Sequence, residues 1–215
     1  MRKYLAEFIG TFALVFCGTG AIIIDKESGG AITHVGVAVT FGLIVAAMIY
    51  SLGEVSGAHL NPAVTFAFWL SKSFPTKELI PYMFSQGFGA FTASVVLKLL
   101  FPLNQTLGST LPAGSPLQSF VLELILTFLL MLVIFQLAKG SKEQGMFAGI
   151  AIGSVVLLEA MFAGPICGAS MNPIRSLAPA LVSGHTEHLW VYVTAPFIGA
   201  TLSFFCWKIL NSKTN

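Results

Sequence analysis

Ser56-Gly57-Ala58-His59-Leu60-Asn61-Pro62-Ala63 and Cys167-Gly168-Ala169-Ser170-Met171-Asn172-Pro173-Ile174 are two versions of one pattern, and Asn172 lies 111 positions after Asn61. In both versions small residues precede Asn-Pro, and a short apolar segment follows it. Proline suits the first turn of a helix, because the N–H group that it lacks would have no partner there. The pattern therefore predicts two short helices, at about Pro62–Leu70 and Pro173–Leu181, each entered through a non-helical loop.

The composition around this pattern is that of a membrane protein. Charged residues make up 9% of the chain and apolar residues 55%, whereas soluble domains carry about 25% charged residues. The formal net charge of +2 is too small to indicate a nucleic acid partner. A membrane span needs about 20 mainly apolar residues, and the segments after Pro62 and Pro173 are too short. Six other stretches are long enough: about Tyr4–Ile24, Ile32–Leu52, Leu79–Phe101, Leu117–Ala138, Gly145–Phe162 and Leu189–Leu210.

Two further matches show that the chain is internally duplicated. Glu7–Phe12 resembles Glu123–Phe128, and Tyr82, Gly89 and Ala90 match Tyr192, Gly199 and Ala200 in the same order. We therefore expect one domain over residues 1–215, built from repeat one at about 1–103 and repeat two at about 117–211. Each repeat holds three spans, which is an odd number, so the second enters the membrane from the opposite side. Inverted repeats with short interrupted segments place a solute path near the bilayer midplane.

Lysine and arginine predict the orientation, because they are enriched in cytoplasmic loops. Most of them lie at the two termini, between spans two and three, and between spans four and five, which we therefore expect in the cytoplasm: Arg2, Lys3, Lys72, Lys77, Lys139, Lys142, Lys208 and Lys213. The extracellular side holds Lys26, with Lys98 near a helix end. An even number of spans agrees with both termini on the cytoplasmic side.

The two loops before the short helices have the properties of a pore lining. Non-helical backbone at membrane depth survives when it is buried in protein or faces a watery cavity. We expect the amino ends of the two short helices to meet near the centre, each with roughly half a positive charge. The amides of Asn61 and Asn172 lie at these ends as donors, and such an arrangement opposes cations and protons. The loop carbonyls expected to line the pore belong to Gly57, Ala58, His59, Gly168 and Ser170.

The chain resembles the aquaporin, or major intrinsic protein, family in Ala6-Glu7-Phe8, in residues 56–65 and in residues 168–176. The resemblance covers essentially the whole chain. It implies an all-α membrane fold of six transmembrane helices plus two re-entrant half-helices in inverted repeats. It also implies a homotetramer with one passive pore per subunit, without cofactor or metal. Ile174 departs from the family, which usually has alanine there; we expect altered packing of the half-helices and an intact pore.

The resemblance also places a selectivity filter near the extracellular mouth. Arg175 at membrane depth is costly and functional by default, and it presents fixed donors to a solute. Water-selective members have a histidine where this chain has Ala160, and many glycerol-passing members have aspartate where it has Ser176. Together with the run Phe162–Ile166, the small filter residues look most like bacterial relatives of the plant nodulin-like proteins, which pass glycerol, urea, ammonia or neutral metalloid acids. The four filter positions are Phe41, Ala160, Ala169 and Arg175.

Three carboxylates fall within the predicted spans. Glu7 and Glu123 occupy equivalent places in the repeats, and we expect each to accept backbone N–H groups of a re-entrant loop. Glu159 has no counterpart in the other repeat. Three roles stay open for it: proton coupling, a hydrogen bond to a nearby helix or loop, and a contribution to the outer mouth.

Several other functions stay open at this point. The filter also allows a strictly water-selective channel, the inverted repeats allow a secondary transporter, and a closed junctional relative would pass nothing. The chain has no nucleophile–base pair, metal cluster or phosphate loop that indicates an enzyme. We expect a multi-pass protein of a prokaryotic inner membrane, because the chain is hardly longer than its six spans.

Overall fold

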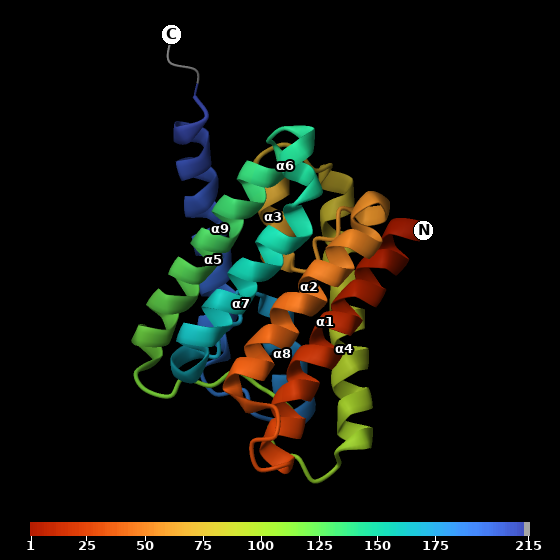
Figure 1. Cartoon of the computed structure of the whole chain (residues 1–215), viewed down its shortest axis with the longest axis vertical. Coiled ribbons are helices and arrows are strands. Elements are labelled where there is room, and N and C mark those ends of the chain that lie inside the picture. Colours follow the sequence, from red (N-terminus) through yellow and green to blue (C-terminus); the bar gives the residue numbers. More distant parts are fainter. Residues whose placement is uncertain (213–215) are drawn as a thin grey trace.

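The computed structural model describes residues 1–212, together with every side chain in that range except that of Lys142. Lys213, one of the residues used above for orientation, lies outside the described residues. Within 1–212 the chain forms nine helices and no strand (Figure 1): α1 (Arg2–Glu27), α2 (Thr33–Ser56), α3 (Pro62–Leu70), α4 (Thr76–Leu100), α5 (Pro116–Ala138), α6 (Lys142–Met146), α7 (Ala148–Cys167), α8 (Pro173–Ser183) and α9 (Leu189–Leu210).

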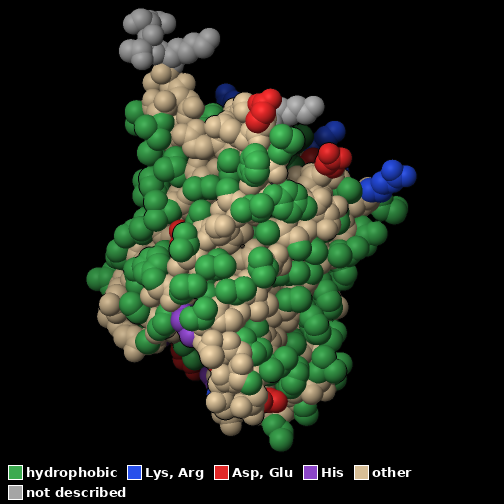
Figure 2. Space-filling model, viewed as in Figure 1, with side chains coloured by type: hydrophobic (Ala, Val, Ile, Leu, Met, Phe, Trp, Pro, Cys, Tyr) green, Lys and Arg blue, Asp and Glu red, His purple; other side chains and the backbone are tan. Residues whose placement is uncertain are grey.

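Six of these helices, α1, α2, α4, α5, α7 and α9, are long and apolar enough to cross a membrane. Large apolar side chains on their outer faces are exposed, which suits contact with lipid. In Figure 2 hydrophobic side chains cover most of the visible face, and most charged side chains gather at the end that carries α6 and the N-terminus. The predicted membrane fold is confirmed. Exposed examples are Leu43, Phe84, Phe88, Leu99, Leu158 and Phe205.

The two half-helices lie inside the bundle, and each packs against a long helix of both repeats. α3 packs against α9 and α4, and α8 packs against α4 and α9, while α3 and α8 also touch each other. In Figure 1 α3 lies near the end that carries α6, and α8 lies near the opposite end. The largest helix contacts are α2 with α7, α5 with α9 and α1 with α4. The repeats are therefore interlocked and share one core.

Two equivalent glycines permit the closest helix contacts within each repeat. A Cβ atom on Gly89 would collide with the Phe8 backbone carbonyl of α1, and one on Gly199 would collide with the Leu124 carbonyl of α5. Backbone groups cannot move aside as side chains can. The matching glycines of the duplicated pattern thus serve the packing of α4 on α1 and of α9 on α5.

The fifth long helix differs from the sequence prediction at its C-terminal end. The expected span Gly145–Phe162 is α7, which runs from Ala148 through Pro165 to Cys167. A proline inside a helix leaves the carbonyl four residues earlier without its usual donor. Here that carbonyl belongs to Met161, and the His34 ring Nε2 lies 2.7 Å from it. This bond from α2 explains how the helix continues past the point where the sequence predicted its end.

The short helix α6 was not predicted. It begins with a capping box, in which the Ser141 hydroxyl accepts the Gln144 backbone N–H and the Gln144 side chain accepts the Ser141 N–H. Tyr50 of α2 holds the following turn, because its hydroxyl donates to the Met146 carbonyl at 3.3 Å and accepts the Ile150 N–H at 3.3 Å. The connection between α5 and α7 is therefore an ordered cover beside the bundle interior.

Candidate pore

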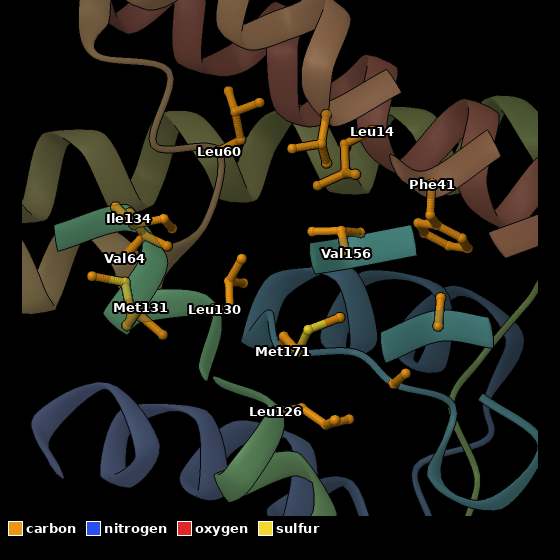
Figure 3. Close-up of a cluster of buried hydrophobic side chains, with 14 of the residues drawn as sticks. Leu14, Phe41, Leu60, Val64, Leu126, Leu130, Met131, Ile134, Val156 and Met171 are labelled. Carbon is orange, nitrogen blue, oxygen red and sulfur yellow. The ribbon is translucent and has the colours of Figure 1, made fainter. Parts of the chain in front are cut away.

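A cavity of about 920 Å³ lies inside the bundle between the two repeats. It extends from Tyr50 and Met146, at the end that carries α6, to Phe41 and Arg175. Figure 3 shows apolar side chains that border this region, including Leu14, Leu130 and Val156, gathered from α1, α5 and α7. The predicted pore residues on its wall are Gly57, Ala58, His59, Asn61, Ala169, Ser170 and Asn172, besides Phe41 and Arg175.

Asn61 and Asn172 both line this cavity, and each binds the loop of the opposite repeat. Each caps its own half-helix: the Asn61 Oδ1 accepts the Ala63 N–H at 2.9 Å, and the Asn172 Oδ1 accepts the Ile174 N–H at 3.2 Å. These bonds fix which amide atom is oxygen. The Asn61 Nδ2 donates to the Met171 carbonyl at 2.8 Å, and the Asn172 Nδ2 donates to the Leu60 carbonyl at 2.9 Å. An amide nitrogen has two hydrogens, so one hydrogen of each asparagine remains for the lumen.

The two loops before these asparagines repeat the same unusual backbone. Gly57 and Gly168 have φ near +85° and end α2 and α7. The non-glycine residues with positive φ alternate in each loop, and each costs of order 1–3 kcal/mol unless its surroundings hold it. This geometry therefore requires support from outside the loop. These residues are Ala58 and Leu60 in the first loop, and Ala169 and Met171 in the second.

The first loop is held by Glu7 of α1, which is fully buried. One carboxylate oxygen accepts the Ser56 hydroxyl at 2.7 Å and the His59 N–H at 2.9 Å. The other accepts the Leu60 N–H and the Gln86 amide, both at 2.8 Å. Four donors thus surround one carboxylate and compensate for its burial.

The second loop is held by Glu123 of α5 in the same position but with fewer donors. It accepts the Ser170 N–H at 2.7 Å and the Met171 N–H at 2.8 Å. Cys167 takes the place of the serine that serves Glu7, and Pro196 takes the place of the glutamine. The support is therefore the same in kind and weaker in number.

Arg175 lies beside Phe41 at the far end of the cavity. It is 3% exposed, and its guanidinium carbon is 4.9 Å from the centroid of the Phe41 ring. Its Nη1 donates to the Gly108 carbonyl at 2.8 Å. Ala160 and Ala169 are buried and belong to the same core cluster as Phe41. Fixed donors and an aromatic wall are thus brought together at this end of the cavity, and Ala169 is on the same cavity wall.

Some predicted residues do not line the cavity. Ala160 and Gly168 are absent from its wall, as are Pro62 and Pro173, which lie inside the first turns of α3 and α8. The sequence also gave no signal for three carbonyls that hold pore side chains. Leu60 and Met171 accept the asparagine amides, and Gly108 accepts from Arg175. No side-chain pattern could identify them, because backbone carbonyls occur at every residue.

Glu159 lies away from the cavity wall, in α7. It is 4% exposed, and neither carboxylate oxygen has a hydrogen-bond partner among residues 1–212. The sequence expectation of a hydrogen bond to a neighbouring helix is therefore not met within the described residues. In the same range no group of three or more His, Cys, Asp or Glu side chains could hold a metal ion.

Comparisons with known proteins agree with this geometry. A family model described as "Major intrinsic protein" matches residues 1–207. Aquaporin NIP1-1 of Zea mays is 45% identical over 211 residues, which cover 98% of this chain and 75% of that protein. Nodulin-26 of Glycine max is 42% identical over 211 residues, which cover 98% and 78%.

A solved structure gives the same result at the level of the fold. The aquaglyceroporin from Plasmodium falciparum matches with a TM-score of 0.87 and 27% identity, over 98% of this chain and 96% of that one. The family consists of channels and not of enzymes. The chain therefore belongs to the major intrinsic protein family, the aquaporins, and is a multi-pass membrane channel for water and small uncharged solutes.

Proposed function

We propose that the pore passes water together with glycerol, urea, ammonia or neutral metalloid acids, and excludes ions and protons. The observation that carries this proposal is the crossed pair of hydrogen bonds from Asn61 and Asn172 to the opposite loops, at 2.8 and 2.9 Å. These bonds hold the amino ends of α3 and α8 against each other in the middle of the cavity.

The electrostatics of this centre oppose cations. Each half-helix contributes roughly half a positive charge at its amino end, and Arg175 adds a full charge near the mouth. The remaining amide hydrogens of Asn61 and Asn172 are donors, so a water molecule at the centre accepts from them with its oxygen. That oxygen is then unable to accept a proton from the next water, and a proton wire is interrupted.

The solute range follows from the side chains around Arg175. Ala169 and Phe41 line the cavity beside Arg175, and Phe41 offers an apolar wall for a carbon-bearing solute. Ala160 is buried in the core cluster that includes Phe41, and its methyl group leaves free the space that an imidazole at this position would fill. The guanidinium donates to the solute oxygens. We assign the filter to these four residues and the central constriction to Asn61 and Asn172, with Pro62 and Pro173 beginning the half-helices behind them. We assign the lining carbonyls to Gly57, Ala58, His59 and Ser170, and loop support to Glu7 and Glu123.

The surroundings of the pore are part of the same proposal. We infer one channel domain over residues 1–215 with inverted repeats at about 1–103 and 117–211, assembled as a homotetramer in the bilayer. Basic residues at the α6 end favour cytoplasmic termini. A prokaryotic inner membrane stays a prediction, since the relatives named above are from plants and Plasmodium.

Reconstituted liposomes test the solute range. We expect stopped-flow assays to show fast flux of water, glycerol, urea and arsenite through the unmodified protein. Ala160→His narrows the filter and adds a donor, so glycerol permeability should fall about tenfold while water permeability changes less than about twofold. Ala160→Leu is the matched control, because it narrows the filter without a donor and should lower both.

Two results would overturn parts of the proposal. Fast water flux with no glycerol, urea or arsenite flux through the unmodified protein would indicate a strictly water-selective channel. Solute flux that saturates and depends on an imposed proton gradient would indicate a secondary transporter. A channel instead gives flux proportional to the solute gradient at every pH difference.

A further inference from the structure

Arg175 depends on a loop that lies outside both repeats. Among residues 1–212, the one hydrogen bond made by its guanidinium goes to the Gly108 carbonyl, at 2.8 Å. A guanidinium has five N–H donors, so the others are available to the lumen. The place of Gly108 therefore decides where the charge of Arg175 lies relative to Phe41.

One side of Gly108 is fixed by packing on α1. Gly108 has φ +71°, and a Cβ atom there would come within 2.7 Å of the Thr19 Cβ. The preceding Leu107 is fully buried against Ile23 and Leu97. These contacts press the loop against α1 and α4, and Val182, near the C-terminal end of α8, packs against the same cluster. None of them reaches the first turn of α8, which carries Arg175.

A chain of three buried hydroxyls connects the loop to the first turn of α8. The Thr110 hydroxyl donates to the Ser176 hydroxyl at 2.8 Å, and the Ser176 and Ser170 hydroxyls are 2.6 Å apart. The Ser170 hydroxyl donates to the Asn172 carbonyl at 2.9 Å. Each hydroxyl has one hydrogen, so Ser176 donates to Ser170 and the whole chain points from Thr110 to Asn172. Successive hydrogen bonds in one direction strengthen one another.

We propose that Thr110 and Ser176 are positioning residues for Arg175. Their hydrogen bond fixes the loop to the residue next to Arg175 in sequence, so that the Gly108 carbonyl and the guanidinium keep one relative position. The filter opening is thereby held at one width. This inference rests on the proposed role of Arg175 in the filter and goes beyond it, because neither Thr110 nor Ser176 needs to touch a solute.

Removing the link should affect larger solutes more than water. Without it, the Gly108 carbonyl moves relative to α8, and the guanidinium loses its fixed acceptor and moves into the opening beside Phe41. Glycerol fills that opening more completely than water. Glycerol permeability therefore falls more than water permeability, whereas a role in stability alone would leave their ratio unchanged.

The experiment compares glycerol and water permeability in liposomes for single-hydroxyl variants. Thr110→Val keeps the shape and removes the hydroxyl, and it should lower the glycerol-to-water ratio about fivefold. Ser176→Ala should do the same, and the double variant should be no worse than either, because both remove one link. Thr110→Ser restores the hydroxyl and should restore the ratio.

Ser109→Ala is the matched control. Ser109 neighbours Thr110 in the same loop, and its hydroxyl bonds to the Thr106 carbonyl and to the Ser183 hydroxyl. Ser183 is the last residue of α8, so this control removes a link to the far end of that helix and keeps the link beside Arg175. We expect its ratio to equal that of the unmodified protein. A change as large as that of Thr110→Val would mean that any loosening of the loop acts alike, and would overturn the proposal.

Two further measurements separate this inference from the function on which it rests. If Arg175→Ala left both permeabilities unchanged, the proposed filter itself would be contradicted. If Arg175→Ala changed the permeabilities while Thr110→Val left the glycerol-to-water ratio unchanged, the positioning role alone would be contradicted. A structure of Thr110→Val needs no solute: we expect the bond from Arg175 to the Gly108 carbonyl to be lost. Finding it unchanged at its present length overturns the proposal.

Discussion

The two re-entrant loops share a backbone geometry but differ in what holds them. In both, an asparagine caps a half-helix and binds the opposite loop. Glu7 receives four donors, while Glu123 receives two backbone N–H groups. The second loop instead has the hydroxyl chain to Thr110 and the nearby charge of Arg175. The duplication thus preserves what forms the pore centre, and the repeats diverge in the shell behind it.

The largest expected effect comes from removing the carboxylates. Glu7→Leu leaves several buried donors without an acceptor, and each costs about 1–3 kcal/mol, so we expect loss of folded protein. Glu123→Leu leaves fewer donors without an acceptor, and more of the protein should remain folded. Yield of monodisperse protein and melting temperature in detergent measure this. Greater damage from Glu123→Leu than from Glu7→Leu would break the comparison.

A substitution at Ile174 separates packing from pore formation. Its side chain packs with Val15, Ala90 and Ala178. Its backbone N–H donates to the Asn172 side chain, which caps α8, and alanine at this position keeps that bond. Ile174→Ala should lower stability by about 2–4 kcal/mol through the cavity that it leaves. Glycerol and water permeability per folded channel should stay the same, and a changed ratio would show that the side chain shapes the lumen.

Glu159 has no counterpart in the first repeat, and within residues 1–212 its buried carboxyl has no hydrogen-bond partner. Glu159→Leu removes this polar group, and we expect the protein to be more stable by about 1–3 kcal/mol. Glu159→Gln, which keeps the shape and an unpaired polar group, is the control. Lower stability of the leucine variant, or flux that becomes independent of a proton gradient on which it depended before, would reveal a partner or a coupling role.

The smallest effect sharpens the comparison most finely. Cys167 occupies the place of Ser56, and its sulfur accepts the Ala169 N–H at 3.4 Å, where the Ser56 hydroxyl accepts the Ala58 N–H at 3.1 Å. Cys167→Ser should place a hydroxyl donor beside Glu123, as Ser56 does beside Glu7, and raise stability by about 0.5–1 kcal/mol. Ser56→Cys should lower it by a similar amount. If both variants melted at the temperature of the unmodified protein, the hydroxyl donor at this position would be unimportant.

Much of the fold could be predicted because its signals are local. Proline after asparagine gave the start of both half-helices, and apolar length gave the six spans. The predicted end of α7 came too early, because the residue that binds the Met161 carbonyl, His34, is 127 positions away in the sequence. Helix α6 was missed because a five-residue helix has too few residues for an apolar period.

The candidate site was predictable where it depends on side chains that recur in both repeats. Glu7 and Glu123 were paired by their sequence matches, and the contacts of both with loop N–H groups are those expected from inverted symmetry. The unrepeated loop was not predictable in this way. Gly108 and Thr110 act through a backbone carbonyl and a common hydroxyl, and only the folded chain brings them to Arg175 and Ser176.

The central claim is that opposed half-helix ends admit neutral molecules and reject protons. Water flux by light scattering and proton flux by an entrapped pH dye, measured on the same liposomes, test it most directly. We predict water permeability well above that of protein-free liposomes, with proton permeability equal to theirs. Proton flux that rises in proportion to the water flux as more protein is reconstituted would contradict the account.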